Sequence, residues 1–288
     1  MTGLVLNAYT ARQLESYVEH PAHALLVTGS EGIGKGAVVR QLIVRLLAIE
    51  PEHLQSYPYF IHLEPENEHL ISVEAIRDLQ HDMTLKLPTD SGLRIALIEG
   101  AQYLSAEAQN ALLKLLEEPP ENTFLLMTAR HEHDLLPTVR SRVQVLPVKR
   151  PSPDELRTHF TKAGYPAEAT NTALLMSGGL PGLMKALLDG SEDHPLVAAT
   201  GVARILLQKN TYERLLMVET LAKQRRQSLD VVFILQQMAD IALRSATQGS
   251  GAALERWQRV LTAAYRAEEA LIDNAQPKLV LTNLMLEL

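Results

Sequence analysis

The chain has 288 residues, of which 46% are hydrophobic and 21% are charged, and its formal net charge is −7. This length suffices for two or three domains, and the composition is that of an ordinary globular protein. The negative balance argues against a protein that grips a long stretch of DNA by itself, because phosphate neutralisation needs a clustered excess of Lys and Arg. Any contact with nucleic acid would be local or shared with partners.

Cysteine is absent, which excludes disulfides and thiolate zinc sites. No stretch approaches the roughly 20 uninterrupted apolar residues that span a bilayer, and the first residues lack the features of a secretory signal. The histidines lack the spacing of a metal-ligand set. Those considered are His62, His69, His81, His131 and His133. We therefore expect a cytoplasmic protein with no membrane segment and no bound metal.

Between residues 24 and 148, short apolar runs alternate with amphipathic helical stretches. This alternation predicts an α/β fold with a parallel sheet. The expected strands are Ala24–Thr28, Tyr59–Leu63, Arg94–Ile98, Thr123–Thr128 and Val143–Val148. Because these runs are short and nearly all apolar, we expect helices on both faces of the sheet.

A proline-rich segment at Lys149–Pro153 ends this pattern, because proline removes a backbone donor and disfavours helix just before it. The remaining sequence predicts helices alone, with a break at Asp189–Pro195. The expected parts are therefore 1–150, 151–192 and 193–288. In the last part an apolar stripe at helical spacing would need a partner unless it is buried internally. Its members are Leu215, Val218, Leu221 and Ala222.

A glycine-rich loop follows the first expected strand and leads directly into a helix. Its residues of interest are Gly29, Gly32, Gly34, Lys35 and Gly36. Glycines let backbone N–H groups converge on phosphate oxygens, the lysine adds a positive charge, and the helix N-terminus adds its dipole. The pattern indicates descent from a phosphate-binding loop. It leaves open whether nucleotide still binds, the alternative being a glycine-rich turn without a ligand.

Three parts of a hydrolytic site are altered together. Gly36 stands where the pattern requires Ser or Thr to ligate Mg²⁺, and glycine offers no side-chain oxygen. The strand at 94–98 is followed by Glu99 and Gly100 instead of an acidic pair, so one acid is imperfect and the other is missing. Since hydrolysis depends on charge neutralisation and water positioning by all of these groups, we expect no intrinsic ATPase activity.

Several stretches carry a resemblance that covers nearly the whole chain. They are His23–Gly29, Ser105–Pro120, Asn122–Thr128, Leu136–Val143 and Asn274–Leu281. In this order they resemble the AAA+ subunits of bacterial DNA polymerase III clamp loaders, delta-prime and gamma/tau. The stretch that ends at Pro120 is similar to the most specific block of that family. The stretch that ends at Val143 resembles its Ser-Arg-Cys motif, with valine in place of cysteine.

This resemblance implies a RecA-like AAA+ domain at 1–150 with a degenerate phosphate loop, a small helical lid at 151–192, and a helical collar at 193–288 that joins subunits into a ring. Active gamma-type subunits have Thr after the loop lysine, an acidic pair and a four-cysteine zinc module. This chain lacks all three, so it is more similar to delta-prime.

The resemblance also implies what the chain does. A delta-prime subunit would help load the sliding clamp onto primed DNA without hydrolysing ATP. Its implied partners are the gamma/tau and delta subunits, primer-template DNA through the assembled ring, and possible direct contact with the sliding clamp. ATP or ADP would at most bind weakly and without hydrolysis, and no zinc is expected.

Ser141 and Arg142 match the family motif whose arginine reaches into the neighbouring ATP site and stabilises charge on the transferring phosphate. The resemblance therefore implies that Arg142 acts as a finger in trans. The alternative is a surface arginine, or one paired with Glu132 or Asp134.

Two further positions are matched less specifically. Thr128 occupies the sensor-1 position, although a polar residue at a strand end is often only a turn or cap former. Lys185 lies in a stretch similar to the sensor-2 region, but Pro181 and Gly182 alter the helix start, and an ordinary helix-face charge is the simpler interpretation.

Two other functions stay open. The first is an active gamma-type ATPase subunit of the same complex, against which Gly36 and Gly100 speak. The second is a nucleotide-independent AAA+ scaffold outside replication. The presence of Ser141 and Arg142 and of the collar-like end speaks against the second function.

Overall fold

The computed structural model describes residues 4–65, 70–84, 92–191, 194–245 and 251–288. The chain divides into two compact units, Met1–Ser152 and Pro153–Leu288. The boundary lies beside Pro151 and Pro153, where missing backbone donors interrupt regular structure. The division into three parts stays a prediction, because its second boundary falls on residues 192–193, outside the described residues. His69 also lies outside them.

The first unit is built on a parallel five-stranded sheet in the order β2-β3-β4-β1-β5. Its strands are β1 (Ala24–Thr28), β2 (Phe60–Leu63), β3 (Arg94–Ile98), β4 (Thr123–Ala129) and β5 (Gln144–Pro147). All five expected strands are present. The bounds of β1 and β3 match the prediction to the residue, and the start of β2, the end of β4 and both ends of β5 differ from it by one residue. The predicted fold class, a RecA-like α/β domain followed by a helical part, is confirmed.

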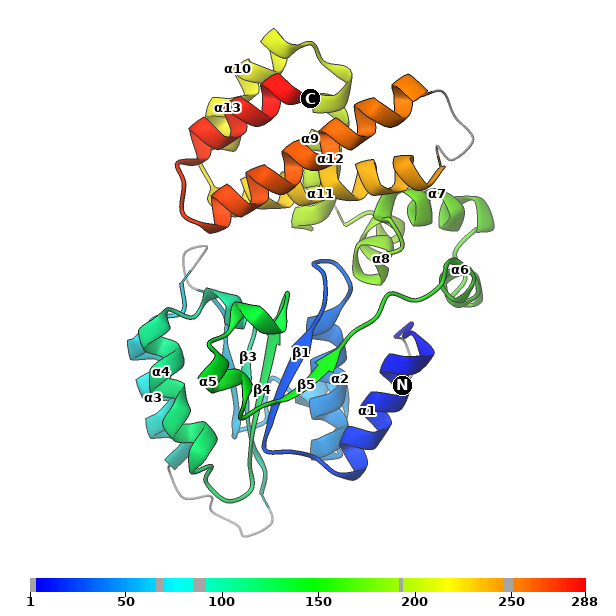
Figure 1. Cartoon of the computed structure of the whole chain (residues 1–288). Helices are drawn as coiled ribbons and strands as arrows, with labels where there is room; N and C mark the ends of the chain where they lie inside the picture. Colours follow the sequence, from blue (N-terminus) through cyan, green and yellow to red (C-terminus); the bar gives the residue numbers. More distant parts are fainter. Residues whose placement is uncertain (1–3, 66–69, 85–91, 192–193, 246–250) are drawn as a thin grey trace. The chain divides into compact units, whose positions relative to one another are not determined.

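Helices cover both faces of the sheet, α1 and α2 on one side and α3, α4 and α5 on the other (Figure 1). Their bounds are α1 (Ala8–Glu19), α2 (Lys35–Leu47), α3 (Val73–Thr84), α4 (Ala106–Glu117) and α5 (Pro137–Arg140), with short 3-10 turns η1 (Pro51–His53), η2 (Ala101–Tyr103) and η3 (Glu132–Asp134). Along β1 the side chains alternate, so that Ala24 and Leu26 pack into the core formed with α3, α4 and α5. This two-sided cover explains why β1 and β3 are buried throughout.

Local sequence fixes two helix starts that matter for the site. Ser105 caps α4, its hydroxyl accepting a hydrogen bond from the Ala108 N–H at 3.1 Å. Gly34 precedes α2 with a positive φ of 95°, a left-handed conformation that favours glycine. The start of α2 is thereby turned toward the carboxyl ends of the strands, where parallel sheets bind their ligands.

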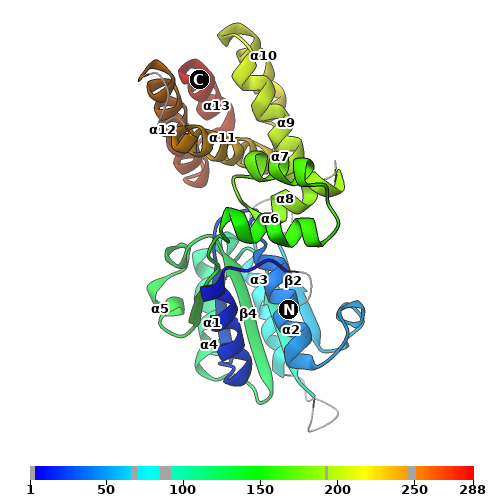
Figure 2. The same ribbon diagram turned by 90° about the vertical axis from the view of Figure 1, so that its right-hand side faces the viewer.

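The second unit consists of helices among its described residues. They are α6 (Pro153–Lys162), α7 (Ala167–Ser177), α8 (Pro181–Asp189), α9 (Pro195–Gln208), α10 (Thr211–Leu221), α11 (Arg225–Ser245), α12 (Gly251–Ile272) and α13 (Pro277–Glu287). Helix α11 is central: Val231–Gln236 is buried on every side, and the helix packs against α7, α9, α12 and α13 (Figure 2).

The predicted apolar stripe of α10 is largely covered inside this unit. Val218 and Leu221 are each 3% exposed, and α10 packs against α13. The large apolar side chains that α10 leaves exposed are Tyr212 and Leu216. Helical period therefore found both the helix and its buried face, and the stripe is covered within the chain. Among the described helices, none combines the length and apolarity that a membrane crossing requires.

Candidate functional site

The loop between β1 and α2 lies at the carboxyl edge of the sheet. The chain leaves β1 at Gly29, whose N–H donates to the carbonyls of Ala129 and Arg130 after β4, and enters α2 at Lys35. Gly32 and Gly34 both have positive φ, at 70° and 95°. The structure thus has the strand, loop and helix arrangement of a phosphate-binding loop.

Lys35 is engaged by its own loop. Its ammonium donates hydrogen bonds to the Gly29 and Ser30 carbonyls at 2.8 and 3.1 Å, and lies 3.7 Å from the Glu31 carboxylate. The side chain is 10% exposed. Burial lowers the pKa of Lys35, and the charge of Glu31 opposes that shift. Its donors are directed at these loop carbonyls and at the Glu31 carboxylate.

Glu99 fills the space beside position 36. A Cβ on Gly36 would lie 3.0 Å from Glu99 Oε1, and the same oxygen is 3.0 Å from Arg40 Nη2 on α2. Burial by itself would raise the pKa of Glu99, but the His62 ring and the Arg40 guanidinium outweigh it, so the pKa is lowered. The carboxylate that follows β3 is therefore ionised and forms an ion pair with the Arg40 guanidinium.

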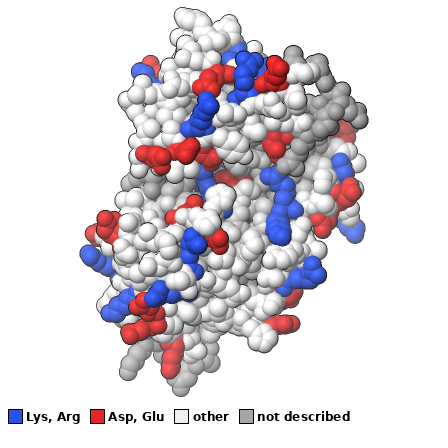
Figure 3. Space-filling model, viewed as in Figure 1, with Lys and Arg blue, Asp and Glu red and all other residues white. Residues whose placement is uncertain are grey.

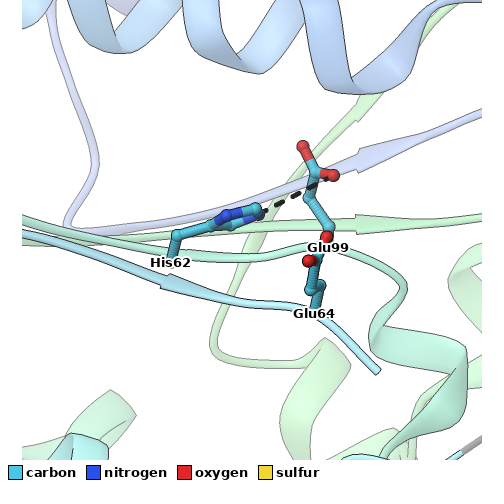
Figure 4. Close-up of side chains that lie close together, drawn as sticks. All are labelled: His62, Glu64 and Glu99. Atoms are coloured by element: carbon cyan, nitrogen blue, oxygen red, sulfur yellow. Dashed lines mark ion pairs between the residues drawn. The ribbon is translucent and has the colours of Figure 1, made fainter. Parts of the chain in front are cut away.

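Glu99 also belongs to a small group that sequence spacing did not reveal. Figure 4 shows His62 pointing toward Glu99, with Glu64 beside them; one ligand atom from each residue lies within 4.8 Å of the others. His62 Nε2 is 3.7 Å from Glu99 Oε2, which is an ion-pair contact and too long for a hydrogen bond. Parallel pairing of β2 with β3 brings these strand ends together. Such a donor set can hold a divalent cation, but Glu99 forms an ion pair with Arg40 and Glu64 is exposed, so we assign an ion-pair group.

The backbone conformation at Gly100, where the second acid is missing, favours glycine. Gly100 has φ 76°, and a Cβ there would lie 2.8 Å from Tyr103 Cδ2. Its N–H donates to Thr128 Oγ1 at 3.0 Å, and Thr128 is 4% exposed. The hydroxyl at the matched sensor position thus satisfies a backbone donor of the β3–η2 turn.

Arg142 follows α5 and is 38% exposed. Its Nη2 lies 2.8 Å from Glu117 Oε1 at the end of α4. Its Nη1 donates to the Thr138 carbonyl at 3.0 Å and to Ser141 Oγ at 3.1 Å, and the Ser141 hydroxyl in turn donates to the Thr138 carbonyl at 3.0 Å. Ser141 and Arg142 are therefore brought together, as the motif suggested.

The acid that pairs with Arg142 is not one of the two considered from the sequence. Glu132 lies 3.5 Å from His133, and Asp134 accepts a hydrogen bond from the His131 N–H at 2.8 Å. Glu117 was missed because it lies far away in sequence and reaches Arg142 only through the packing of α4 on α5. The sequence signal that could have indicated a role for Glu117 was its place in the stretch 105–120, which is similar to the most specific block of the family.

Lys185 on α8 pairs within its own helical unit. Its ammonium lies 2.6 Å from Asp189 Oδ2, one helical turn later, and Tyr165 also donates to Asp189. The hydrogen bond to Asp189 raises the pKa of Lys185, so the lysine is charged. These contacts are those of an ordinary helix-face charge.

The molecular surface carries both signs of charge. On the face that Figure 3 draws, Lys and Arg side chains are interspersed with Asp and Glu. This mixture differs from the continuous basic track that follows a nucleic-acid backbone.

Comparison with known proteins places the chain in a family. A family model described as DNA polymerase III, delta subunit, matches residues 8–152, about half of the chain. The DNA polymerase III subunit delta' of Pseudomonas aeruginosa is 32% identical over 215 residues, 68% of this chain and 65% of that protein. The chain belongs to the delta-prime family of DNA polymerase III subunits.

Other relatives agree with this assignment. The delta' subunit of Haemophilus influenzae is 30% identical over 174 residues, 55% of this chain and 53% of that protein. The chain thus spans between about half and two thirds of the length of these delta-prime relatives. A DNA polymerase III gamma subunit-related protein from Thermotoga maritima has the same fold, with a TM-score of 0.53 and 19% identity over 96% of this chain and 97% of that one.

Proposed function

We propose that this delta-prime family member is a non-hydrolysing AAA+ subunit of the DNA polymerase III clamp loader and that it supplies Arg142 to the ATP site of a neighbouring subunit. The observation that carries the proposal is the space beside Gly36. Residue 36 offers no hydroxyl to ligate Mg²⁺, and the Glu99 carboxylate, which lies 3.0 Å from where a Cβ on Gly36 would be, is paired with Arg40.

The contacts of the loop support the absence of hydrolysis. Phosphoryl transfer needs a metal ion on the β and γ oxygens, a lysine directed at the phosphates and a residue that orients water. In this chain Gly36 has no side-chain oxygen, the Lys35 ammonium is bonded to its own loop, and Gly100 stands where the second acid belongs. ATP or ADP would therefore bind at most weakly, through the backbone N–H groups of the loop.

The exposure of Arg142 supports a role in trans. A guanidinium lent by a neighbour can neutralise charge that develops on a transferring phosphoryl group, and such fingers raise rates by roughly 10³–10⁵. This contribution requires no competent site in the donor chain. A phosphate loop whose lysine is bonded internally and a partly exposed Arg142 are thus both compatible with a subunit that does not hydrolyse ATP itself but supplies an arginine to its neighbour.

The remaining parts of the proposal concern assembly. The helices at 151–192 would form the lid, and those at 193–288 would form the collar that joins the gamma/tau and delta subunits. Contacts with primer-template DNA, and any with the sliding clamp, would be made through the assembled ring. Deleting the whole helical unit after Ser152 should abolish assembly, and normal assembly of such a chain would refute the collar assignment.

The proposal is tested by reconstitution with the gamma/tau and delta subunits of the source cell. The purified chain alone should hydrolyse no ATP above background, whereas its addition to the partners should raise both ATPase activity and clamp loading. ATP turnover by the isolated chain that disappears in Lys35→Ala would instead identify an active ATPase subunit. A complex that forms and works equally well without the chain would favour a scaffold outside replication.

A further inference from the structure

The guanidinium of Arg142 is held from two sides. On one side, Nη1 donates to the Thr138 carbonyl and to Ser141 Oγ. On the other side, Nη2 meets Glu117 Oε1 at 2.8 Å. Because an arginine has five N–H donors in a planar fork, these contacts fix the plane of the group and still leave Nε–H and the second hydrogen of Nη2 for an anion.

Stability gives little reason for the contact between Glu117 and Arg142. The two side chains are 51% and 38% exposed, and ion pairs between exposed side chains contribute little to folding. Glu117 is also the last residue of α4, followed by Glu118, and carboxylates are disfavoured at a helix C-terminus by the helix dipole. The pair thus places a carboxylate at an electrostatically poor position of its own helix, where it forms an ion pair with the guanidinium.

We infer that Glu117 is a positioning residue for Arg142, fixing the guanidinium in the orientation from which it reaches the neighbouring nucleotide. This inference rests on the proposed function of Arg142. A long, solvent-exposed arginine without such a partner samples many rotamers. Because fixing one rotamer in each catalytic cycle costs conformational entropy, such an arginine accelerates hydrolysis less. Glu117 acts through Arg142 and does not itself touch the nucleotide.

The inference predicts a graded loss of activity in the reconstituted complex. The ATPase rate at the site that this chain serves is obtained as the rate of the unaltered complex minus the rate of the complex with Arg142→Ala. At that site, Glu117→Ala should lower kcat about tenfold and Glu117→Gln, which keeps an oxygen acceptor, about threefold. The KM for ATP should stay unchanged, because ATP is bound by the neighbouring subunit. Glu118→Gln is the matched control, with the same charge change one residue away, and should leave the rate unchanged.

A double variant separates positioning from a general structural effect. Glu117→Ala should remove no further activity from a complex that already carries Arg142→Ala, because both changes disable the same group. Normal or raised kcat in Glu117→Ala, with Arg142→Ala impaired, would overturn the positioning role and leave the finger intact. An additive loss in the double variant would also overturn it. Normal activity in Arg142→Ala itself would refute the proposed finger, and the positioning role with it.

Discussion

Lys35 and Arg142 are basic residues of the same α/β unit, and each lies directly after a turn. The Lys35 side chain is 10% exposed and is bonded to the carbonyls of its own loop. The Arg142 side chain is 38% exposed and is braced by Ser141 and Glu117 with part of its fork unused. The Lys35 ammonium is hydrogen-bonded within its own loop, whereas the Arg142 guanidinium is held by neighbouring residues at the surface.

The difference teaches how a nucleotide-binding fold can change its task. The acid after β3 pairs with Arg40 beside Gly36, where a Cβ would lie 3.0 Å from its carboxylate, and the loop lysine lies 3.7 Å from Glu31. None of these changes touches the region of α4 and α5 that holds Arg142. Under the proposed function, this unit would have lost its own chemistry and retained a group that serves another subunit.

The largest expected effect concerns the geometry of the exposed cation. Arg142→Lys keeps the charge but loses the planar fork, and lysine cannot make both the contact to Glu117 and a two-pronged contact to phosphate. We expect hydrolysis at the neighbouring site to fall at least about tenfold, which is close to the effect of alanine. Single-turnover ATPase of the assembled complex measures this. A rate near that of the unaltered complex would mean that charge alone suffices.

The next effect concerns Gly100, which stands where this chain's own phosphate-loop site lacks its second acid. Gly100→Asp would place a side chain at φ 76° and within 2.8 Å of the Tyr103 ring. We expect a loss of about 2 kcal/mol in the free energy of unfolding and no gain of ATPase activity, alone or with Gly36→Thr. Urea unfolding measures the loss. Gly164→Asp, at φ 97° with nothing within 4 Å, is the control for backbone strain alone.

The smallest effect is a pH dependence. Because the folded-state pKa of Glu99 is lowered from the ordinary value of 4.5, its ion pairs add stability above that pH, and this stability is lost as the pH falls through the folded-state value. Glu99→Gln should thus cost about 1 kcal/mol at neutral pH and progressively less below pH 4.5. Denaturant unfolding across this pH range measures the difference. A cost independent of pH would contradict the charge assignment, and Glu118→Gln provides an exposed control.

Much of the fold follows from local sequence. Apolar runs predicted β1 and β3 to the residue, because a strand that is covered on both faces is nearly all apolar. The glycines at positions 36 and 100 could likewise be recognised from the spacing of the loop and strand. The edge strand β5 was predicted one residue too long at each end, since burial constrains it less.

The grouping of side chains was harder to predict. His62 meets Glu99 because β2 lies next to β3, and strand order is not written in the periodicity of either strand. Arg142 was expected near acids close in sequence, but packing of α4 on α5 supplies Glu117. In α10 the spacing of Val218 and Leu221 identified the buried face, but the sequence did not show that α13 within the same chain covers it. Each of these features depends on contacts between elements.

The central claim is that this chain contributes to hydrolysis only through its neighbour. The most direct test compares Lys35→Ala with Arg142→Ala in otherwise identical reconstituted complexes, with subunit stoichiometry verified in each. We predict that Lys35→Ala leaves ATPase activity and clamp loading essentially unchanged. Arg142→Ala should lower hydrolysis at one site at least about tenfold and impair clamp loading more strongly than total ATPase. Loss of activity in Lys35→Ala with a normal rate in Arg142→Ala would contradict the account.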